Sequence, residues 1–537
     1  MIFSRFRASF SQAPRWFQWG WAMVVLAILA LRFWDLQTYA WGYDELSAVF
    51  RAMQAKDWHA HLHQGVAVDG HPAGLQTLIW LWIGANGADV FIPRLFTSLF
   101  SMGVLWQLHG MAKRHFDVET AYWAVCLMGL MWWQAGMSIW IRPYVFGLPF
   151  VLWSWDLVLG VLKHRNVQGD VMLPERMGLF SLKLGGALAG AAYIHYFAGL
   201  TAGASFIALL LLQPKIKPNP SNHTQGLHPS YILFLPVTFA FLFYLPHLPL
   251  TFAQFQLGGL GWLNAPTPKF LWQFLQHATG NSPAILLPFT GVLVYAIQYH
   301  IRIAYLPKPA SFKRILQQPT ILLTLGFLLV FAFGYIYSVV RAPILQNNAL
   351  YFAFPLIILV AASGITTLRN QLGDTQNGIN CFEKRTQLVA ILLPALLLYN
   401  TIYQKQFLTL ERKGSHHRIV EQSLQFAENQ TKSHQTRGTN SDLHIWLDGP
   451  TDNYQFHKGQ TLYKHKISAI PPTVYFESDG PTLPFIAQQL QSLKPGAQVL
   501  EFGQFNLQFA LVAAGALGEN LENEKGTVVD RHVQRAL

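Results

Sequence analysis

Long apolar runs are the feature that most constrains this sequence. Several exceed 18 residues, the length that an α-helix needs to cross the hydrocarbon core of a bilayer. Only 12% of the 537 residues are charged, about half the share found in soluble proteins. These properties exclude an ordinary soluble enzyme and a disordered chain, and they predict a polytopic membrane protein.

The excess of basic residues is confined to the apolar part of the chain. The 404 residues before Lys405 contain 25 basic and 13 acidic residues, whereas the remainder is balanced at 13 of each. Basic clusters mark cytoplasmic loops, so membrane topology explains the high pI and no nucleic-acid partner is expected. The cysteines, Cys126 and Cys381, fall in a predicted helix and a predicted cytoplasmic loop, and no disulfide is expected.

Hydropathy and the positive-inside rule predict eleven spans with a cytoplasmic N-terminus. The spans lie at about 16–34, 91–112, 119–139, 144–162, two within 177–213 that meet near His195-Tyr196, 230–247, 284–301, 319–340, 347–368 and 386–404. Every even-numbered span ends in a basic cluster. The apolar segment 73–85 is too short to cross and would break this parity, so we expect a helix at the outer surface.

The tail from residue 405 onward has a different pattern. It predicts strands at Leu443–Leu447, Thr473–Phe476 and Gln498–Phe502, and a helix at Leu483–Leu493. The predicted fold class is therefore an all-α polytopic membrane domain (1–404) followed by a small α/β domain (405–537). Parity places that second domain outside the cytoplasm.

The topology confines the outer carboxylates to one region. Every outer-face acid of the membrane part lies in or beside the first outer loop, 38–90, so a general base acting outside would come from there. Within Trp41-Gly42-Tyr43-Asp44-Glu45 two acids are adjacent. Neighbouring side chains on a helix point about 100° apart, so one acid can face a cleft while the other packs. The alternative is that both simply begin a helix.

A second group of candidates is the turn Asp69-Gly70-His71-Pro72, which leads into segment 73–85. Asp69 either caps that helix or contributes to a site, and His71 can bind a phosphate when protonated. The alternating histidines at 59, 61 and 63 have no acid or cysteine at ligand spacing. We therefore expect a solvated histidine-rich loop and no metal site.

Other outer loops contribute cationic and polar side chains. A guanidinium can bind a phosphate with two hydrogen bonds, or it can anchor to lipid headgroups. The candidates are Arg142 and Tyr144 between the third and fourth spans, His195 and Tyr196 between the fifth and sixth, and Arg341, Gln346, Asn347 and Asn348 between the ninth and tenth. Together they suit an anionic lipid headgroup and a polar acceptor.

The outer loop 248–282 has no acid and a single lysine, and it carries Trp262 and Trp272. This composition favours a lid or a sugar-stacking surface at the membrane interface. A plain connecting loop is an equal alternative.

Several short motifs occur in a characteristic order. They are Tyr43-Asp44-Glu45, Asp69-Gly70-His71-Pro72-Ala73-Gly74, Ile92-Pro93-Arg94-Leu95, Ile141-Arg142-Pro143-Tyr144, Ile194-His195-Tyr196-Phe197 and Tyr244-Leu245-Pro246-His247-Leu248-Pro249. With these motifs the chain, over about 1–415, resembles the glycosyltransferases of the GT-C fold. Within this fold it resembles the branch that contains protein O-mannosyltransferases and lipid A aminoarabinose transferases. The resemblance is to the bacterial family-39-like members of that branch.

The resemblance implies transfer of a sugar, with inversion, from a polyprenyl-phosphate carrier to a lipid, glycan or protein acceptor outside the cytoplasm of a bacterium. Asp44 would be the general base and Glu45 its partner. The implied donor-phosphate contacts are His71 (a lysine in relatives), Arg142, Tyr144 and Arg341, and the implied substrate contacts are Asp69, His195, Tyr196, Trp262 and Asn347. Relatives often carry an arginine where this chain has Asn347-Asn348. Neither a metal nor a cofactor is expected.

Two other functions remain as alternatives. A flippase or transporter of lipid-linked sugars would use the same anion-binding surface without chemistry. Such proteins place polar residues at mid-membrane and often contain repeats, whereas here the predicted spans are poor in acids apart from Asp156 and no repeat is found. A membrane-anchored binding protein that works through its tail is the other alternative.

Overall fold

The structure is a computed structural model. It describes residues 15–34, 36, 45, 48, 51–52, 55–86, 91–164, 171, 176–214, 229–256, 263–305, 312–374, 391–408, 443–447, 473–476 and 498–502. The chain divides into two compact units. The first comprises Met1–Gln37 with Gln54–Thr409, and the second Thr38–Met53 with Leu410–Leu537.

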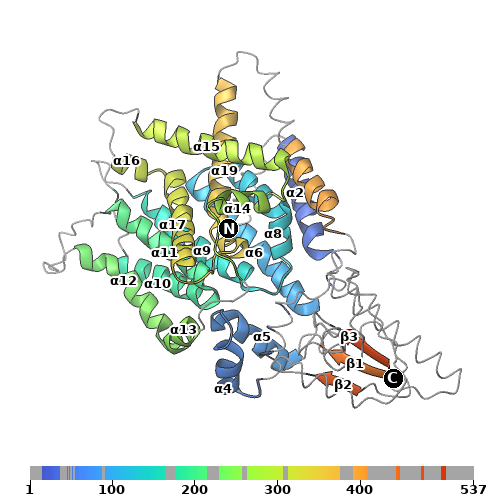
Figure 1. Cartoon of the computed structure of the whole chain (residues 1–537). Coiled ribbons are helices and arrows are strands. Elements are labelled where there is room, and N and C mark those ends of the chain that lie inside the picture. The colour runs from blue at the N-terminus through green and yellow to red at the C-terminus, as the bar shows by residue number, and fades with distance from the viewer. Residues whose placement is uncertain are drawn as a thin grey trace. The chain divides into compact units, whose positions relative to one another are not determined.

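The regular elements that the structure describes in the first unit are all helices (Figure 1). Its elements are α2 (Arg15–Phe33), α4 (Trp58–Ala60), η1 (His61–Val66), α5 (Ala73–Asn86), α6 (Phe91–His115), α7 (Val118–Leu130), α8 (Trp132–Met137), α9 (Pro143–Val161), α10 (Met177–Ile194), α11 (Tyr196–Leu212), α12 (Pro229–Tyr244), η2 (Leu245–His247), α13 (Leu248–Phe255), α14 (Phe270–Ala278), α15 (Pro283–Tyr305), α16 (Phe312–Leu316), α17 (Pro319–Val340), α18 (Asn347–Leu350), α19 (Phe354–Asp374) and η3 (Asn400–Gln404). Every predicted span overlaps one or more of these helices.

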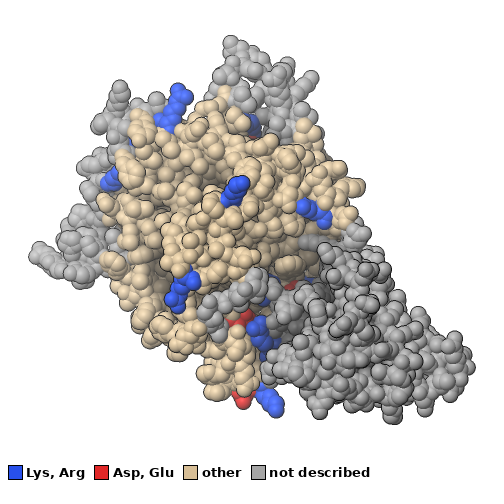
Figure 2. Space-filling view, in the orientation of Figure 1, with Lys and Arg blue, Asp and Glu red and all other residues tan. Residues whose placement is uncertain are grey.

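Five segments among the described residues are long and apolar enough to cross a membrane. They are α9, α10, Phe234–Phe255, α15 and α17. Shorter apolar helices at Gln18–Phe33, Val118–Leu130, Tyr196–Leu212 and Ile391–Gln404 coincide with further predicted spans. Figure 2 shows Lys and Arg only scattered over the described surface of this view, as suits a lipid-facing protein. A membrane protein is confirmed, and the number of eleven spans stays a prediction.

Two boundaries were predicted with different success. The turn between the fifth and sixth predicted spans is confirmed, since His195 alone separates α10 from α11. In contrast, the predicted span 119–139 is broken at Met131, whose backbone is extended, into α7 and α8. The range 248–282 contains the short helices α13 and α14.

Close contacts between helices hold α10 against α9, α11 and α12. A Cβ at Gly185 of α10 would lie 2.5 Å from Phe239 Cβ and 2.7 Å from the Pro236 carbonyl oxygen of α12. Only glycine therefore permits this approach, as is common between membrane helices. On the other side α10 and α11 both contact α9, where Trp155 is fully buried and donates to the Thr201 carbonyl at 3.1 Å.

The second unit contains a three-stranded sheet in the order β2-β1-β3. Its strands β1 (Leu443–Leu447), β2 (Thr473–Phe476) and β3 (Gln498–Phe502) are parallel and confirm the three predicted strands. Parallel neighbours need crossover connections, usually helices. The predicted helix 483–493 lies outside the described residues, so the α/β domain stays a prediction.

Candidate functional site

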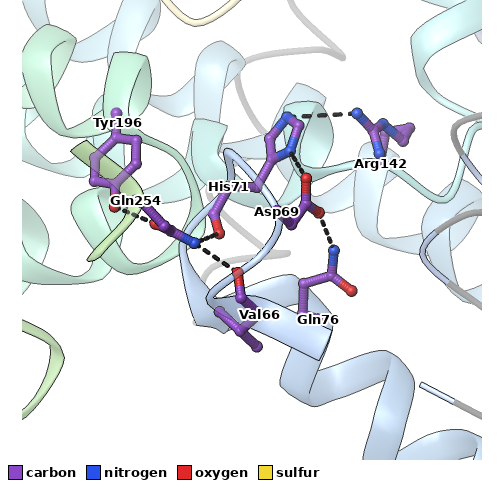
Figure 3. Close-up of polar contacts among 7 residues, drawn as sticks. All are labelled: Val66, Asp69, His71, Gln76, Arg142, Tyr196 and Gln254. Carbon is purple, nitrogen blue, oxygen red and sulfur yellow. Dashed lines mark hydrogen bonds and ion pairs between the residues drawn. The ribbon is translucent and has the colours of Figure 1, made fainter. Parts of the chain in front are cut away.

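Five polar side chains from three parts of the first unit meet in a polar cluster, here defined as Asp69, His71, Gln76, Arg142 and His195. Figure 3 shows the first four of these residues. Nδ1 of His71 lies 3.0 Å from Asp69 Oδ1, and Nη2 of Arg142 lies 3.4 Å from His71 Nε2. Gln76 donates to the second oxygen of Asp69. The rings of His71 and His195 are 5.3 Å apart. Four of these residues were predicted from sequence, and Gln76 was not.

Prolines shape the backbone at two members of the cluster. Arg142 is extended, with φ −133° and ψ 160°, because a following proline disfavours the helical conformation. Pro143 then begins α9, a position where its missing N–H costs nothing. His71 likewise precedes Pro72, immediately before α5. Both side chains are thus held at the start of a helix.

Gly74 brings the two histidines together. A Cβ at this position would lie 2.6 Å from the Tyr193 carbonyl oxygen and 2.9 Å from Ile194 Cδ1. Any other residue would push the first turn of α5 away from the end of α10. The contact places His71, three residues before Gly74, beside His195 at the α10–α11 turn.

The hydrogen bonds define the protonation of His71. An ionised carboxylate only accepts and a guanidinium only donates. Nδ1 of His71 therefore carries the proton shared with Asp69, while Nε2 accepts from Arg142 and the ring is neutral. Protonation of Nε2 would make both nitrogens donors and would turn Arg142 and His71 into a cationic pair.

His195 has the opposite character. It lies between α10 and α11, and its Nδ1 accepts the N–H of Phe197 at 3.1 Å, which caps α11. Burial lowers the pKa of His195 well below its usual value, the neighbouring His71 and Arg142 lower it further, and Asp69 opposes the shift. His195 is therefore a neutral ring whose proton sits on Nε2 and can be donated to an oxygen.

Aromatic rings form one wall of the polar cluster. The ring of His195 lies 4.7 Å from Phe352 and 6.2 Å from Tyr144. Tyr144 in turn packs at 5.9 Å from Tyr351. Tyr144 was predicted as a phosphate contact, and the structure places its ring in this buried wall.

Two residues that sequence reasoning missed support the turn carrying Asp69 and His71. Gln254 of α13 donates from Nε2 to the carbonyl oxygens of Val66 (2.8 Å) and His71 (2.7 Å) (Figure 3). His247 accepts the N–H of Ala73 at 2.9 Å. Tyr196, predicted to bind substrate, donates its hydroxyl to Gln254 Oε1. His247 lies in a motif singled out above, whereas no sequence pattern marked Gln254.

Five further residues were predicted to belong to the site. Asp44 and Trp262 are outside the described residues. Glu45 is a buried helical residue of the second unit. Arg341 is exposed at the end of α17, and Asn347 opens α18 with a buried Oδ1 that has no hydrogen-bond partner. Within the described residues no hydrogen bond joins Arg341 or Asn347 to the polar cluster.

The histidine run at 59–63 is partly packed. His61 is buried, stacks on Trp80 of α5 at 5.0 Å and lies 3.2 Å from Thr77 Oγ1, and burial lowers its pKa. His59 and His63 are exposed with rings 4.3 Å apart. Among the described residues there is no group of three or more His, Cys, Asp or Glu side chains that could hold a metal.

Solved structures with the same arrangement were found. ArnT from Cupriavidus metallidurans matches in the apo state (TM-score 0.51) and bound to undecaprenyl phosphate (TM-score 0.53). In both cases 11% of residues are identical, and the match covers 92% of this chain and 94% of ArnT. The chain has the GT-C fold. No protein-family model and no curated protein sequence matches it.

Proposed function

We propose that this protein is a membrane glycosyltransferase that moves a sugar from a polyprenyl-phosphate donor to an acceptor at the outer face of a bacterial inner membrane. The observation that carries the proposal is the contact of His71 with both Arg142 and Asp69. Nε2 of His71 lies 3.4 Å from Arg142 Nη2, and Nδ1 of His71 lies 3.0 Å from Asp69 Oδ1. These contacts occur in a chain with the GT-C fold. ArnT, a solved structure to which this fold is similar, binds undecaprenyl phosphate. We also propose the orientation that the basic clusters at the span ends predict, with the N-terminus in the cytoplasm and residues 405–537 outside it.

The polar cluster suits a phosphate monoester or diester. The nitrogens of Arg142 and His71 that face each other can both turn to phosphate oxygens once His71 is protonated. Asp69 offsets the charge gained by His71, so the pair can be charged although Arg142 is only 7% exposed. Neutral His195 supplies one further donor. An anion thereby replaces the Arg142–His71 contact by stronger charge-assisted hydrogen bonds.

The reaction balances as a direct displacement with inversion. An acceptor oxygen forms a bond to the anomeric carbon while the bond between that carbon and the phosphate oxygen breaks. Polyprenyl phosphate leaves with the electron pair, and Asp44 takes the acceptor proton, with Glu45 as its partner. Arg142 and protonated His71 stabilise the charge that grows on the leaving phosphate. The role of Asp44 rests on the family resemblance and on its place in the first outer loop.

Remaining residues have supporting roles in this proposal. We propose that Arg341, Asn347 and Trp262 contact the donor and its sugar. We also propose that the range 248–282 acts as a lid over the bound donor. Lipid, glycan and protein remain the acceptor classes, and the sugar is a hexose or a pentose.

The test is transfer of radiolabelled sugars from a panel of undecaprenyl-phosphate donors by membranes carrying wild type, Asp44→Asn or Arg142→Ala. We expect Asp44→Asn to retain donor binding and lose transfer, and Arg142→Ala to lose donor binding. Full transfer by Asp44→Asn would refute its role as base and redirect the search to Glu45 and Asp69. Donor binding by the wild type without transfer from any donor would favour a flippase instead.

A further inference from the structure

The side-chain amide of Gln254 forms hydrogen bonds to three different residues of the protein. It lies in the last turn of α13 and is buried, at 7% exposure. Both protons of its Nε2 are used, one for the Val66 carbonyl and one for the His71 carbonyl, and its Oε1 accepts from the Tyr196 hydroxyl (Figure 3). Its hydrogen-bonding groups all point into the protein rather than to lipid or water.

The two carbonyls that Gln254 holds enclose Asp69. Val66 ends η1, and its carbonyl also accepts the N–H of Asp69 at 3.0 Å. The His71 carbonyl follows two residues later. One amide group thus closes the turn 66–71, which carries both Asp69 and His71. The position of the His71 ring relative to Arg142 depends on this closure.

A second contact from the same part of the chain fixes the next residues. Nε2 of His247 accepts the N–H of Ala73 at 2.9 Å, so Nδ1 carries the proton and donates to Thr251 of α13 at 2.9 Å. The Tyr244 hydroxyl completes this network at 2.8 Å from Thr251 Oγ1. α13 therefore holds the turn at Val66 and His71 directly, and at Ala73 through His247.

We propose that Gln254 is a positioning residue for the donor-phosphate site, acting through His71. It holds the turn 66–71 closed from α13, so that the His71 ring, oriented by Asp69, stands beside Arg142. This inference rests on the proposed function, because it takes the polar cluster to be the phosphate site. The hydrogen bonds of Gln254 go to two backbone carbonyls and to Tyr196.

Gln254→Glu tests this role with little change in shape. The glutamate keeps an acceptor for Tyr196 but presents an oxygen to two carbonyl oxygens. Gln107→Glu is the matched control, because Gln107 Nε2 also donates to a backbone carbonyl, that of Pro149 at 2.9 Å, outside the polar cluster. Tyr196→Phe is a milder second variant, since it removes only the hydroxyl that orients the Gln254 amide.

The measurement is the Kd of the full-length, detergent-solubilised protein for undecaprenyl phosphate, with the thermal midpoint of each variant. We expect Gln254→Glu to raise Kd about tenfold and Gln107→Glu to leave it unchanged. Tyr196→Phe should raise Kd less. In a His71→Ala background Gln254→Glu should have no further effect on Kd, because the residue through which it acts is gone. A purely structural role would not produce this loss of effect.

The outcomes separate the two proposals. An unchanged Kd in Gln254→Glu would overturn the positioning role. So would an equal loss of affinity from Gln254→Glu in the wild-type and His71→Ala backgrounds. A wild type that binds undecaprenyl phosphate and shows the expected pattern, but transfers no sugar, would refute the proposed enzyme and leave the role of Gln254 in place. A wild type without affinity for undecaprenyl phosphate would overturn both.

Discussion

At the scale of single residues, the site depends on two histidines with different protonation. Asp69 accepts the proton that Nδ1 of His71 carries. His195 stays neutral because it is buried beside Arg142 and His71. The sequence predicted that these side chains share the outer face. It did not predict which nitrogen of each ring is protonated, because that depends on distances of a few ångströms between residues far apart in the chain.

Replacing Asp69 by asparagine should weaken donor binding. The amide keeps the shape of the carboxylate but no longer offsets the charge of protonated His71. We expect Kd for undecaprenyl phosphate at pH 7.5 to rise about tenfold, in line with the loss of one charge-assisted hydrogen bond. Binding titrations of the variant and the wild type at pH 7.5 would check this. An affinity equal to wild type at pH 7.5 would contradict the role of Asp69.

His195 should make the fold sensitive to acid. Because its pKa is lowered in the folded protein, the unfolded chain binds this proton more readily. The free energy of unfolding therefore falls as pH drops below about 6.5, by at most about 1.4 kcal/mol per pH unit. His195→Asn can still cap α11 but does not titrate, so its thermal midpoint should fall less between pH 7 and pH 5. Equal slopes for both proteins would refute this assignment.

At the scale of elements, hydropathy predicted most helices and missed what joins them. The strands of the tail were also predicted, because alternation of apolar residues is a local signal. The break at Met131 was not, since an apolar helix and an apolar extended residue have the same hydropathy. Nor was the support from Gln254 and His247, because an amide or imidazole bonded to a distant backbone carbonyl or N–H leaves no spacing pattern in the sequence.

The contact between α5 and α10 should be intolerant of any side chain at Gly74. We expect Gly74→Ala to destabilise the protein by about 1–3 kcal/mol, because its Cβ would collide with the Tyr193 carbonyl oxygen. Donor affinity should fall with it, since the turn bearing His71 is displaced. Gly103→Ala in α6 is the control, because a Cβ there meets nothing within 4 Å. Thermal unfolding of both variants would test this, and similar midpoints would contradict it.

At the scale of the whole molecule, the proposed function requires one orientation in the membrane. The GT-C fold was predicted from short motifs in order and is supported by the match to ArnT across 92% of the chain. The fold does not by itself say which end faces out. The basic clusters at the ends of the even-numbered spans, such as Lys113 and Arg114, predict the orientation, and we propose on that basis that the polar cluster faces outward.

Substituted cysteines would test this orientation. His59 and Lys163 are both exposed, and they fall on predicted outer and inner faces. In a Cys381→Ser background, where Cys126 is buried, a membrane-impermeant maleimide should label His59→Cys in intact spheroplasts. It should label Lys163→Cys only after permeabilisation. The reverse pattern would show that the polar cluster faces the cytoplasm.

The most direct test of the central claim is the affinity of purified full-length protein for undecaprenyl phosphate when Arg142 is removed. Arg302→Ala is the control, because Arg302 is an exposed arginine in the last turn of α15. We predict that Arg142→Ala raises Kd at least about tenfold, the cost of losing a charge-assisted hydrogen bond, while Arg302→Ala binds like the wild type. Equal affinities of Arg142→Ala and wild type would show that the donor phosphate is not bound at the polar cluster.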